Sequence, residues 1–192
     1  MIINTLLSHL NQFIKLEDTE VLYLKSHIPI QTFPKNTYLL KEGSISKAFY
    51  FIIKGCVRLF YTVDGEEKTA FFYTENKFVS SYESFTKQLP SKHNLQCIEP
   101  TTVAVITVEA AQKLLEFSPK FEFLARIMME EELIVYQNII STFITLSNEQ
   151  RYLHLLETEP ELMQRIPQYY LATYLGVRPE TLSRIRKRLV DK

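Results

Sequence analysis

The sequence predicts an α+β protein in which an antiparallel jelly-roll barrel is followed by a long helix and a small all-α domain with a helix-turn-helix. Three observations favour this order. Short runs of β-branched and aromatic residues fill residues 30–107, and the hydrophobic spacing becomes helical after Thr107. Residues 167–190 then contain two short helical patterns separated by Gly176.

The first elements are two helical segments, residues 6–13 and 17–28, and then the barrel. Asp64-Gly65 stands between two strand-like runs at residues 57–61 and 69–73, and this dipeptide is typical of a two-residue hairpin. The other short strands are expected near residues 49–53, 77–79, 94–98 and 102–106.

A helix is predicted over Val108–Phe117 with Thr107 as its cap, and a longer one from Pro119 to about Leu146. Apolar residues occupy more than one side of the longer helix, and such a helix must bury two sides. One side could face the barrel and the other a second copy of the chain; the alternative is a helix buried inside a monomer. Ser147, followed by Gln150, is the expected capping box of the next helix.

The last segment is the most informative. Pro167 suits the first turn of a helix, Gly176 can take the left-handed conformation that ends one, and Pro179 begins another. Each helix has one apolar edge, formed by Leu171, Ala172 and Leu175 in the first and by Leu182, Ile185 and Leu189 in the second. This spacing predicts two short helices that cross closely at the small residue Ala172.

The opposite face of the second helix is polar. Residues 178–192 hold six basic and two acidic residues, a net charge of +4 in a chain whose total charge is zero. Arginine suits guanine and glutamate suits the cytosine amino group in the major groove of DNA, while the other cations suit phosphates. The candidate DNA-binding residues are Arg178, Glu180, Thr181, Ser183, Arg184, Lys187 and Arg188. The alternative is an ordinary solvated amphipathic helix.

Composition excludes several classes. The chain has 192 residues, 46% hydrophobic and 23% charged, which is ordinary for a globular protein and excludes a disordered or collagen-like one. No apolar run reaches 18 residues and the N-terminus does not read as a signal peptide, so we expect a cytoplasmic protein with no membrane partner. Two cysteines are too few for an iron–sulfur cluster within one chain. No cofactor and no metal are expected.

The sequence resembles the Crp–Fnr family of bacterial transcription regulators over nearly its whole length. In the barrel the resemblance rests on Leu40-Lys41-Glu42-Gly43, residues 49–59 and residues 64–68; in the last domain it rests on Leu175-Gly176-Val177 and residues 180–185. It implies a cyclic-nucleotide-binding-like β-roll at residues 1–118, a dimerisation helix at 119–146 and a winged helix-turn-helix at 147–192. It implies double-stranded DNA and a second copy as partners, with RNA polymerase and an unidentified small effector as further candidates. Its base-contacting positions match Glu180 and Arg184, with Thr181 near the DNA backbone.

The sequence departs from the family pattern in three places. Nucleotide-binding members carry a Gly-Glu pair and a later Arg-Ser or Arg-Thr pair for the ribose and phosphate, whereas residues 78–84 and 91–94 here contain neither pair. Lys92 cannot replace the two-pronged arginine, so we expect no control by cyclic AMP. Pro179 occupies a base-reading position, and no residues remain after the second helix for the strands of the wing, which we expect to be truncated or absent.

Three other functions would each need residues in a different pattern. A cupin-like barrel enzyme would need clustered ligands, but His9, His27, His93 and His154 form no His-x-His pair, and no nucleophile motif is present, so no enzymatic activity is expected. A small-molecule sensor would use a pocket at Tyr73, Phe78, Ser80, Ser81, Tyr82 and Lys92, although its aromatic residues could equally be plain core. A redox sensor would use Cys56 or Cys97, but both lie in strand-like runs where cysteine is normally buried and inert.

Overall fold

The computed structural model describes residues 2–190 and, of Val190, the backbone only. Asp191 and Lys192, which were counted in the basic segment, lie outside the described residues. The chain forms two compact units: the first contains Met1–Leu59 and Phe72–Met129, and the second contains Phe60–Phe71 and Glu130–Lys192. The second unit is therefore assembled from two separate stretches of the sequence.

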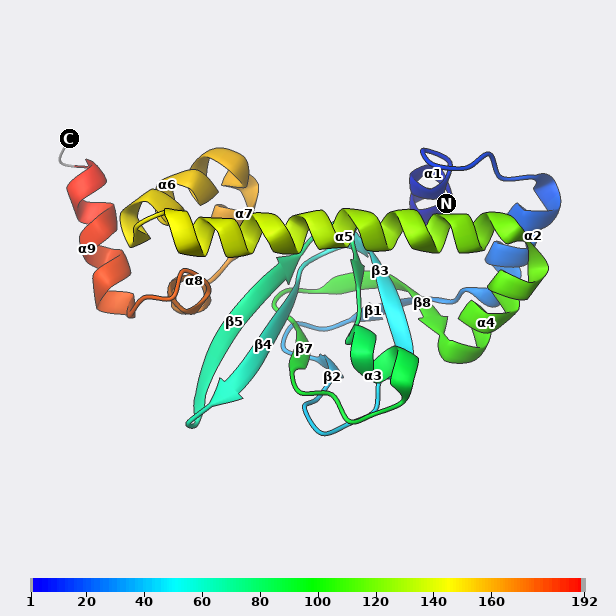
Figure 1. Cartoon of the computed structure of the whole chain (residues 1–192), viewed down its shortest axis with the longest axis horizontal. Coiled ribbons are helices and arrows are strands. Elements are labelled where there is room, and N and C mark those ends of the chain that lie inside the picture. Colours follow the sequence, from blue (N-terminus) through cyan, green and yellow to red (C-terminus); the bar gives the residue numbers. More distant parts are fainter. Residues whose placement is uncertain (1, 191–192) are drawn as a thin grey trace. The chain divides into compact units, whose positions relative to one another are not determined.

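Within residues 2–190, eight strands form two four-stranded sheets with the orders β1-β8-β3-β6 and β2-β7-β4-β5 (Figure 1). This is the strand order of a jelly roll, so the predicted barrel is correct in class but consists of two sheets. In the first sheet Ala104 of β8 lies opposite both Ile30 of β1 and Phe51 of β3. The strands are β1 (Ile30–Phe33), β2 (Tyr38–Leu40), β3 (Ala48–Lys54), β4 (Val57–Val63), β5 (Glu66–Tyr73), β6 (Phe78–Val79), β7 (Asn94–Cys97) and β8 (Thr101–Thr107).

Two turns in the jelly roll depend on glycine. Asp64 and Gly65 both have positive φ, 52° and 78°, as the predicted two-residue hairpin between β4 and β5 requires. Gly55, between β3 and β4, has φ of 112°, and a Cβ atom there would lie 2.6 Å from the Thr101 hydroxyl oxygen and 2.8 Å from the Pro100 carbonyl oxygen. Only glycine fits at this position.

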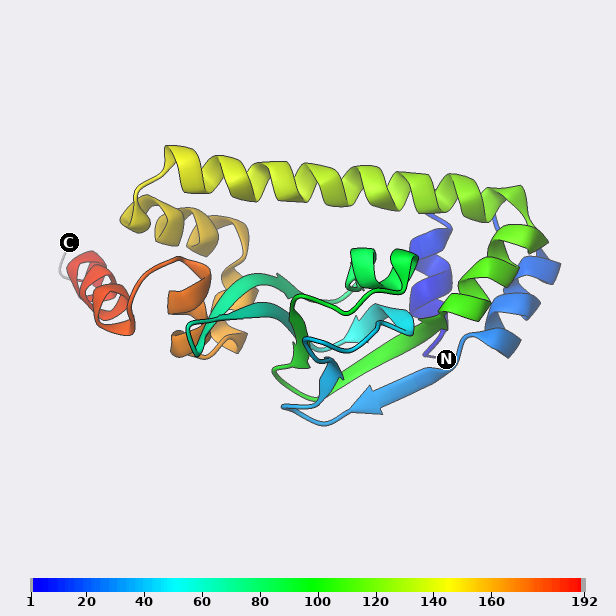
Figure 2. The same ribbon diagram turned by 60° about the horizontal axis from the view of Figure 1, so that its bottom comes forward.

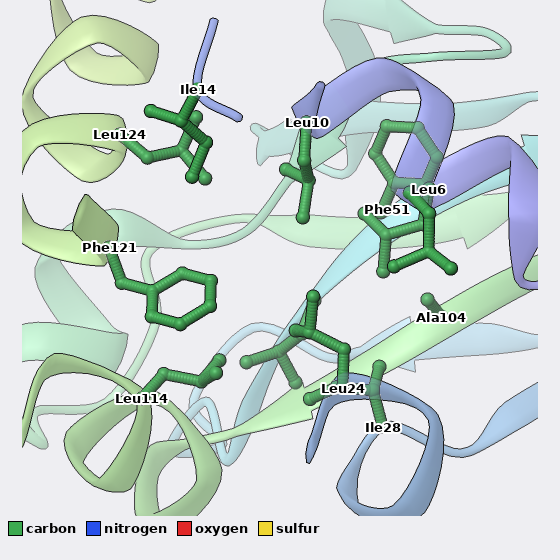
Figure 3. Packing of buried hydrophobic residues seen from close by; sticks show 12 residues of the cluster. Leu6, Leu10, Ile14, Leu24, Ile28, Phe51, Ala104, Leu114, Phe121 and Leu124 are labelled. Atoms are coloured by element: carbon green, nitrogen blue, oxygen red, sulfur yellow. The ribbon is translucent and has the colours of Figure 1, made fainter. Parts of the chain in front are cut away.

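The hydrophobic core of the first unit joins the N-terminal helices to one face of the jelly roll. Leu6 and Leu10 of α1 (Asn4–Leu10) and Leu24 of α2 (Asp18–His27) pack with Phe51 and Ala104 (Figure 3). The same cluster includes Leu114 of α4 (Val108–Phe117) and Phe121 and Leu124 of α5 (Pro119–Thr145). Helices α2 and α4 lie side by side (Figure 2), and the rings of Tyr23 and Phe117 stack there at 4.4 Å.

The predicted helices are present, with small differences at their ends. Thr107 caps α4 by accepting a hydrogen bond from the Ala110 amide at 3.1 Å. α5 ends at Thr145 instead of Leu146, α2 is one residue shorter at each end than predicted, and α1 covers Asn4–Leu10 instead of residues 6–13. After Leu10 the chain continues as turns, in which the amides of Gln12 and Phe13 donate to carbonyls three residues earlier. A short helix, α3 (Tyr82–Lys87), was not predicted.

A buried carboxylate ties α2 to the start of α5. Glu20 is 4% exposed and accepts hydrogen bonds from the Ser118 hydroxyl at 2.8 Å and from the Lys120 ammonium at 3.1 Å. Burial alone would raise the pKa of Glu20, but the hydrogen bonds from the Glu17 amide, Ser118 and Lys120 hold it below its ordinary value.

Helix α5 has a continuous exposed apolar stripe. Met129, Leu133, Ile140 and Ile144 are all exposed and follow one another at intervals of four, seven and four residues. At 100° per residue these side chains lie within an arc of about 60° on the helix.

No helix within residues 2–190 is both long and apolar enough to cross a membrane.

Candidate nucleic-acid interface

The predicted helix-turn-helix is formed by α8 (Gln168–Tyr174) and α9 (Pro179–Val190) (Figure 1). Gly176 has φ of 70°, and the amide of Val177 donates to the Ala172 carbonyl at 3.0 Å, so the first helix closes in a Schellman-type turn. The preceding helices of this unit are α6 (Asn148–Thr158) and α7 (Pro160–Arg165). Ser147 and Gln150 form the predicted capping box at the start of α6.

The apolar edges of both helices are buried as the spacing predicts. Leu182 and Ile185 of α9 are 1% and 2% exposed, and Ala172 of α8 is fully buried. Leu189 is half-buried. Burial of Leu182 and Ile185 fixes the rotation of α9 and therefore which side chains it presents to solvent.

The structure brings the candidate DNA-binding residues together on one exposed surface. Glu180, Ser183, Arg184 and Lys187 are exposed on α9, Thr181 is half-buried beside them, and Arg178 is exposed in the turn that precedes the helix. The Thr181 hydroxyl accepts a hydrogen bond from Nη2 of Arg184 at 3.2 Å. Side chains on one helical face with these donors and acceptors can contact base edges and phosphates.

Arg188 differs from the other cations on this face. One of its guanidinium nitrogens lies 3.1 Å from a carboxylate oxygen of Glu149, in the first turn of α6. Arg188 is therefore partly neutralised within the protein. The sequence could not show this pair because Glu149 and Arg188 belong to different helices of the domain.

Arg151 connects the turn of the helix-turn-helix to the end of α5. Its guanidinium donates to the Leu146 carbonyl at 2.9 Å, the Leu175 carbonyl at 3.1 Å and the Asn148 side chain, and it lies 4.6 Å from the centre of the Phe143 ring. The two carbonyls belong to the C-terminal ends of α5 and α8, where backbone acceptors lack helical partners and a cation is favourable. Sequence analysis did not single out this residue.

The distal part of the β4–β5 hairpin belongs to the same compact unit as the helix-turn-helix. Thr69 of β5 is 6% exposed, and its hydroxyl lies 2.8 Å from the hydroxyl of Thr173 in α8. Phe71 of β5 packs edge-on against Tyr136 of α5, with ring centres 4.8 Å apart. This part of the hairpin is thus a structural component of the second unit.

Near the hairpin tip, Glu66 is exposed and forms an ion pair with Lys68. The hydrogen bond and the charge of Lys68 hold the pKa of Glu66 below its ordinary value, and the positive charge of Arg178 contributes in the same direction. Arg178 is one of the candidate DNA-binding residues, so an acidic side chain of the hairpin lies within its electrostatic range.

The candidate effector residues differ in their burial and in their contacts. Tyr73 and Ser81 are buried, and Ser81 accepts a hydrogen bond from the Ser91 hydroxyl at 3.0 Å. Phe78 packs against the N-terminal core and Tyr82 is exposed; Ser80 is half-buried. Lys92 is largely exposed and forms an ion pair with Glu83 at 3.1 Å, so its charge is already partnered.

Sequence analysis missed a buried cation in the jelly roll. Arg58 of β4 is fully buried and donates to the Gln96 side chain of β7 at 3.0 Å. Alternation along β4 places Arg58 on one face of the strand but does not show whether that face is interior. In the structure residues 57–60 are all buried, so both faces of this part of β4 are covered.

The structure also places the residues that a redox sensor or a metal site would need. Cys56 and Cys97 are both buried and are not joined in a disulfide, and burial raises the pKa of the Cys97 thiol. Within residues 2–190 no group of three or more His, Cys, Asp or Glu side chains is arranged to hold a metal ion.

Comparison with known proteins gives the same architecture. Residues 30–117 match the family described as "Cyclic nucleotide-binding domain". The c-di-GMP responsive global regulator CLP of Xanthomonas campestris superposes with a TM-score of 0.73 at 21% identity, over 91% of this chain and 92% of that one. FixK2 of Bradyrhizobium japonicum gives a TM-score of 0.73 at 17% identity over 85% of each chain. The catabolite activator protein of Thermus thermophilus gives 0.58 at 20% identity, over 95% of this chain and 87% of that one.

No curated protein sequence matches the chain. The matches to solved structures nevertheless extend across the jelly roll, the long helix and the helix-turn-helix, so the predicted resemblance is confirmed at the level of the fold. Residues 30–117 match the cyclic nucleotide-binding domain family, and the chain has the fold of solved transcription regulators, one of which is described as a putative regulator of the crp/fnr family.

Proposed function

We propose that this protein is a transcription regulator that binds palindromic double-stranded DNA as a homodimer. The observation that carries the proposal is α9: two fully buried anchors, Leu182 and Ile185, aim a polar and basic face at solvent. The Crp–Fnr fold supports it, because this helix follows a jelly roll and a long helix in the order found in those regulators.

In this proposal Arg184 reads guanine and Glu180 accepts from the amino group of cytosine. The two residues are four positions apart on α9, so their side chains project about 6 Å from each other on one face. Thr181, Ser183 and Lys187 contact the DNA backbone.

The apolar stripe of α5 supports the homodimer. Exposed Met129, Leu133, Ile140 and Ile144 share one face, and two such stripes packed together would remove them from water. A two-fold dimer carries two α9 helices, which requires half-site centres separated by about one turn of DNA, about 34–36 Å.

The domain assignment follows from the same reasoning: residues 1–118 sense, residues 119–146 dimerise and residues 147–192 bind DNA, with the β4–β5 hairpin contributing to the DNA-binding unit. Cyclic AMP is not the effector, because Lys92 is exposed and held by Glu83 instead of being aimed at a buried phosphate. RNA polymerase and an unidentified small effector are further proposed partners.

Gel-shift titration at two salt concentrations tests the proposal, with DNA fragments that the protein retains from sheared genomic DNA. Arg184→Ala should weaken specific binding by about 1–3 kcal/mol and relax the preference at one base pair of each half-site. Lys187→Ala, a matched loss of one positive charge on the same face, should weaken all sequences alike and lower the salt slope by about one.

If both variants behave identically on specific and random DNA, Arg184 does not read a base. If neither changes binding, α9 is an ordinary solvated helix and the proposed function is wrong.

A further inference from the structure

The β4–β5 hairpin, residues 60–71, makes contacts that bear on how the DNA-binding surface is controlled. If the hairpin only closed the jelly roll, it would belong to the same compact unit as the other strands. Instead, residues 60–71 form one compact unit with Glu130–Lys192. The hairpin strands continue without interruption into the first unit through Leu59 and Phe72.

The contact with α8 is specific. Thr69 and Thr173 approach to 2.8 Å between hydroxyl oxygens, and Thr69 is 6% exposed, so this hydrogen bond is largely shielded from water. The Thr173 hydroxyl also lies 2.9 Å from the Tyr170 carbonyl of its own helix, so it can donate there while accepting from Thr69. Both hydroxyls are then satisfied, and each loses a partner when the hairpin and α8 separate.

The charges at the hairpin tip oppose DNA. Asp64, Glu66 and Glu67 stand at or beside the turn, with Lys68 as the one cation among residues 60–71. Glu66 lies within the electrostatic range of Arg178, at the start of the recognition helix. A carboxylate near Arg178 competes with a DNA phosphate for the same cation and repels the phosphates beside it.

We propose that the β4–β5 hairpin restrains the helix-turn-helix in a conformation of low DNA affinity through the Thr69–Thr173 hydroxyl pair, and that the acidic side chains of the hairpin tip disfavour DNA in that conformation. This inference rests on the proposed function, since it describes regulation of the same DNA-binding surface. An event in the jelly roll that moves β4 and β5 releases α8 and α9, because these two strands are continuous with the hairpin.

The first experiment locks the contact. In the double variant Thr69→Cys/Thr173→Cys the thiols replace oxygens that are 2.8 Å apart, close enough for a disulfide after a small adjustment. Oxidised protein should lose at least about tenfold in affinity for the retained fragments, and reduction should restore it. The two single cysteine variants are the controls, and the affinity of each should be the same before and after treatment with the oxidant.

The outcomes separate the two claims. Failure of the double variant to cross-link shows that the hairpin does not dock at α8, and equal binding by locked and reduced protein shows that the docked state is not inhibited; each overturns the inference. If wild-type and reduced protein bind no DNA at all, the proposed function itself fails.

The second experiment isolates the charge. Glu66→Gln should raise DNA affinity by about two- to fivefold at low salt, and the gain should shrink as salt increases. Glu109→Gln is the matched control, because Glu109 is also exposed, is also paired with a lysine, Lys113, and lies in α4 of the first unit. Equal gains in both variants would show that the gain in affinity comes from the net charge of the protein alone. That result would overturn the local role of Glu66.

Discussion

Replacing Arg151 should loosen the helix-turn-helix without unfolding the jelly roll. Arg151→Met keeps most of the aliphatic stem but removes the donors to the Leu146 and Leu175 carbonyls and the cation over the Phe143 ring. Arg151 is half-buried, so each lost carbonyl bond is taken at about 1 kcal/mol, the ordinary net value of an intramolecular hydrogen bond and below the range for charged donors. The cation–π contact adds about 0.5–1 kcal/mol. The opening free energy of the helix-turn-helix should fall by about 2–3 kcal/mol.

Hydrogen exchange measured by mass spectrometry resolves this loss by region. A loss of that size should accelerate exchange of the α8 and α9 amides by about 30- to 150-fold, at 1.4 kcal/mol for each factor of ten. Peptides from β3 and β8 are the internal control and should not change. Arg151→Lys keeps the positive charge without the forked geometry, so its exchange rates should be intermediate. Rates in α8 and α9 within about threefold of wild type would show that Arg151 does not hold the domain.

Three further results are expected. In sedimentation, Ile140→Glu should convert a dimer into a 22.6 kDa monomer. Ile134 is about equally exposed but lies outside the stripe, so Ile134→Glu should have a much smaller effect. A dimer that is unaffected by Ile140→Glu would contradict the stripe as the interface. Calorimetry with cyclic AMP should show no micromolar binding, and a micromolar dissociation constant would mean that another anion site replaces Lys92. Glu20→Gln should destabilise the protein by about 1–3 kcal/mol at pH 7. Because the folded pKa of Glu20 is depressed, this difference should be complete above its ordinary pKa and disappear as the pH falls through the folded one; equal urea midpoints at pH 7 would refute it.

Local sequence signals predicted most of the fold. The Asp64-Gly65 hairpin, the Thr107 cap and the turn at Gly176 each depend on residues within a few positions of one another, and each appears in the structure. The buried edge of α9 also follows from helical periodicity alone. Such features can be predicted because the chemistry that determines them is contiguous in the chain.

The features that sequence reasoning missed are contacts between distant segments. Arg151 reads as one more charged residue on an amphipathic helix, and only the fold places two helix ends around it. Arg58 in a strand would normally point to solvent, and its burial against Gln96 depends on how the two sheets pack. The Thr69–Thr173 pair joins residues that are more than half the chain apart. The candidate effector pocket and the base-reading roles of α9 stay predictions.

The divided composition of the second unit limits how this protein can be taken apart or recombined. No single cut in the chain separates the two units, because residues 60–71 are encoded between segments of the first one. A fragment that begins at Glu130 would leave Tyr136 without Phe71 and Thr173 without Thr69. A chimera that exchanges only the C-terminal part with a related regulator would join a foreign α8 to this hairpin. Residues facing each other at positions 69 and 173 should therefore change together during evolution, and functional chimeras should require exchange of the hairpin together with α8 and α9.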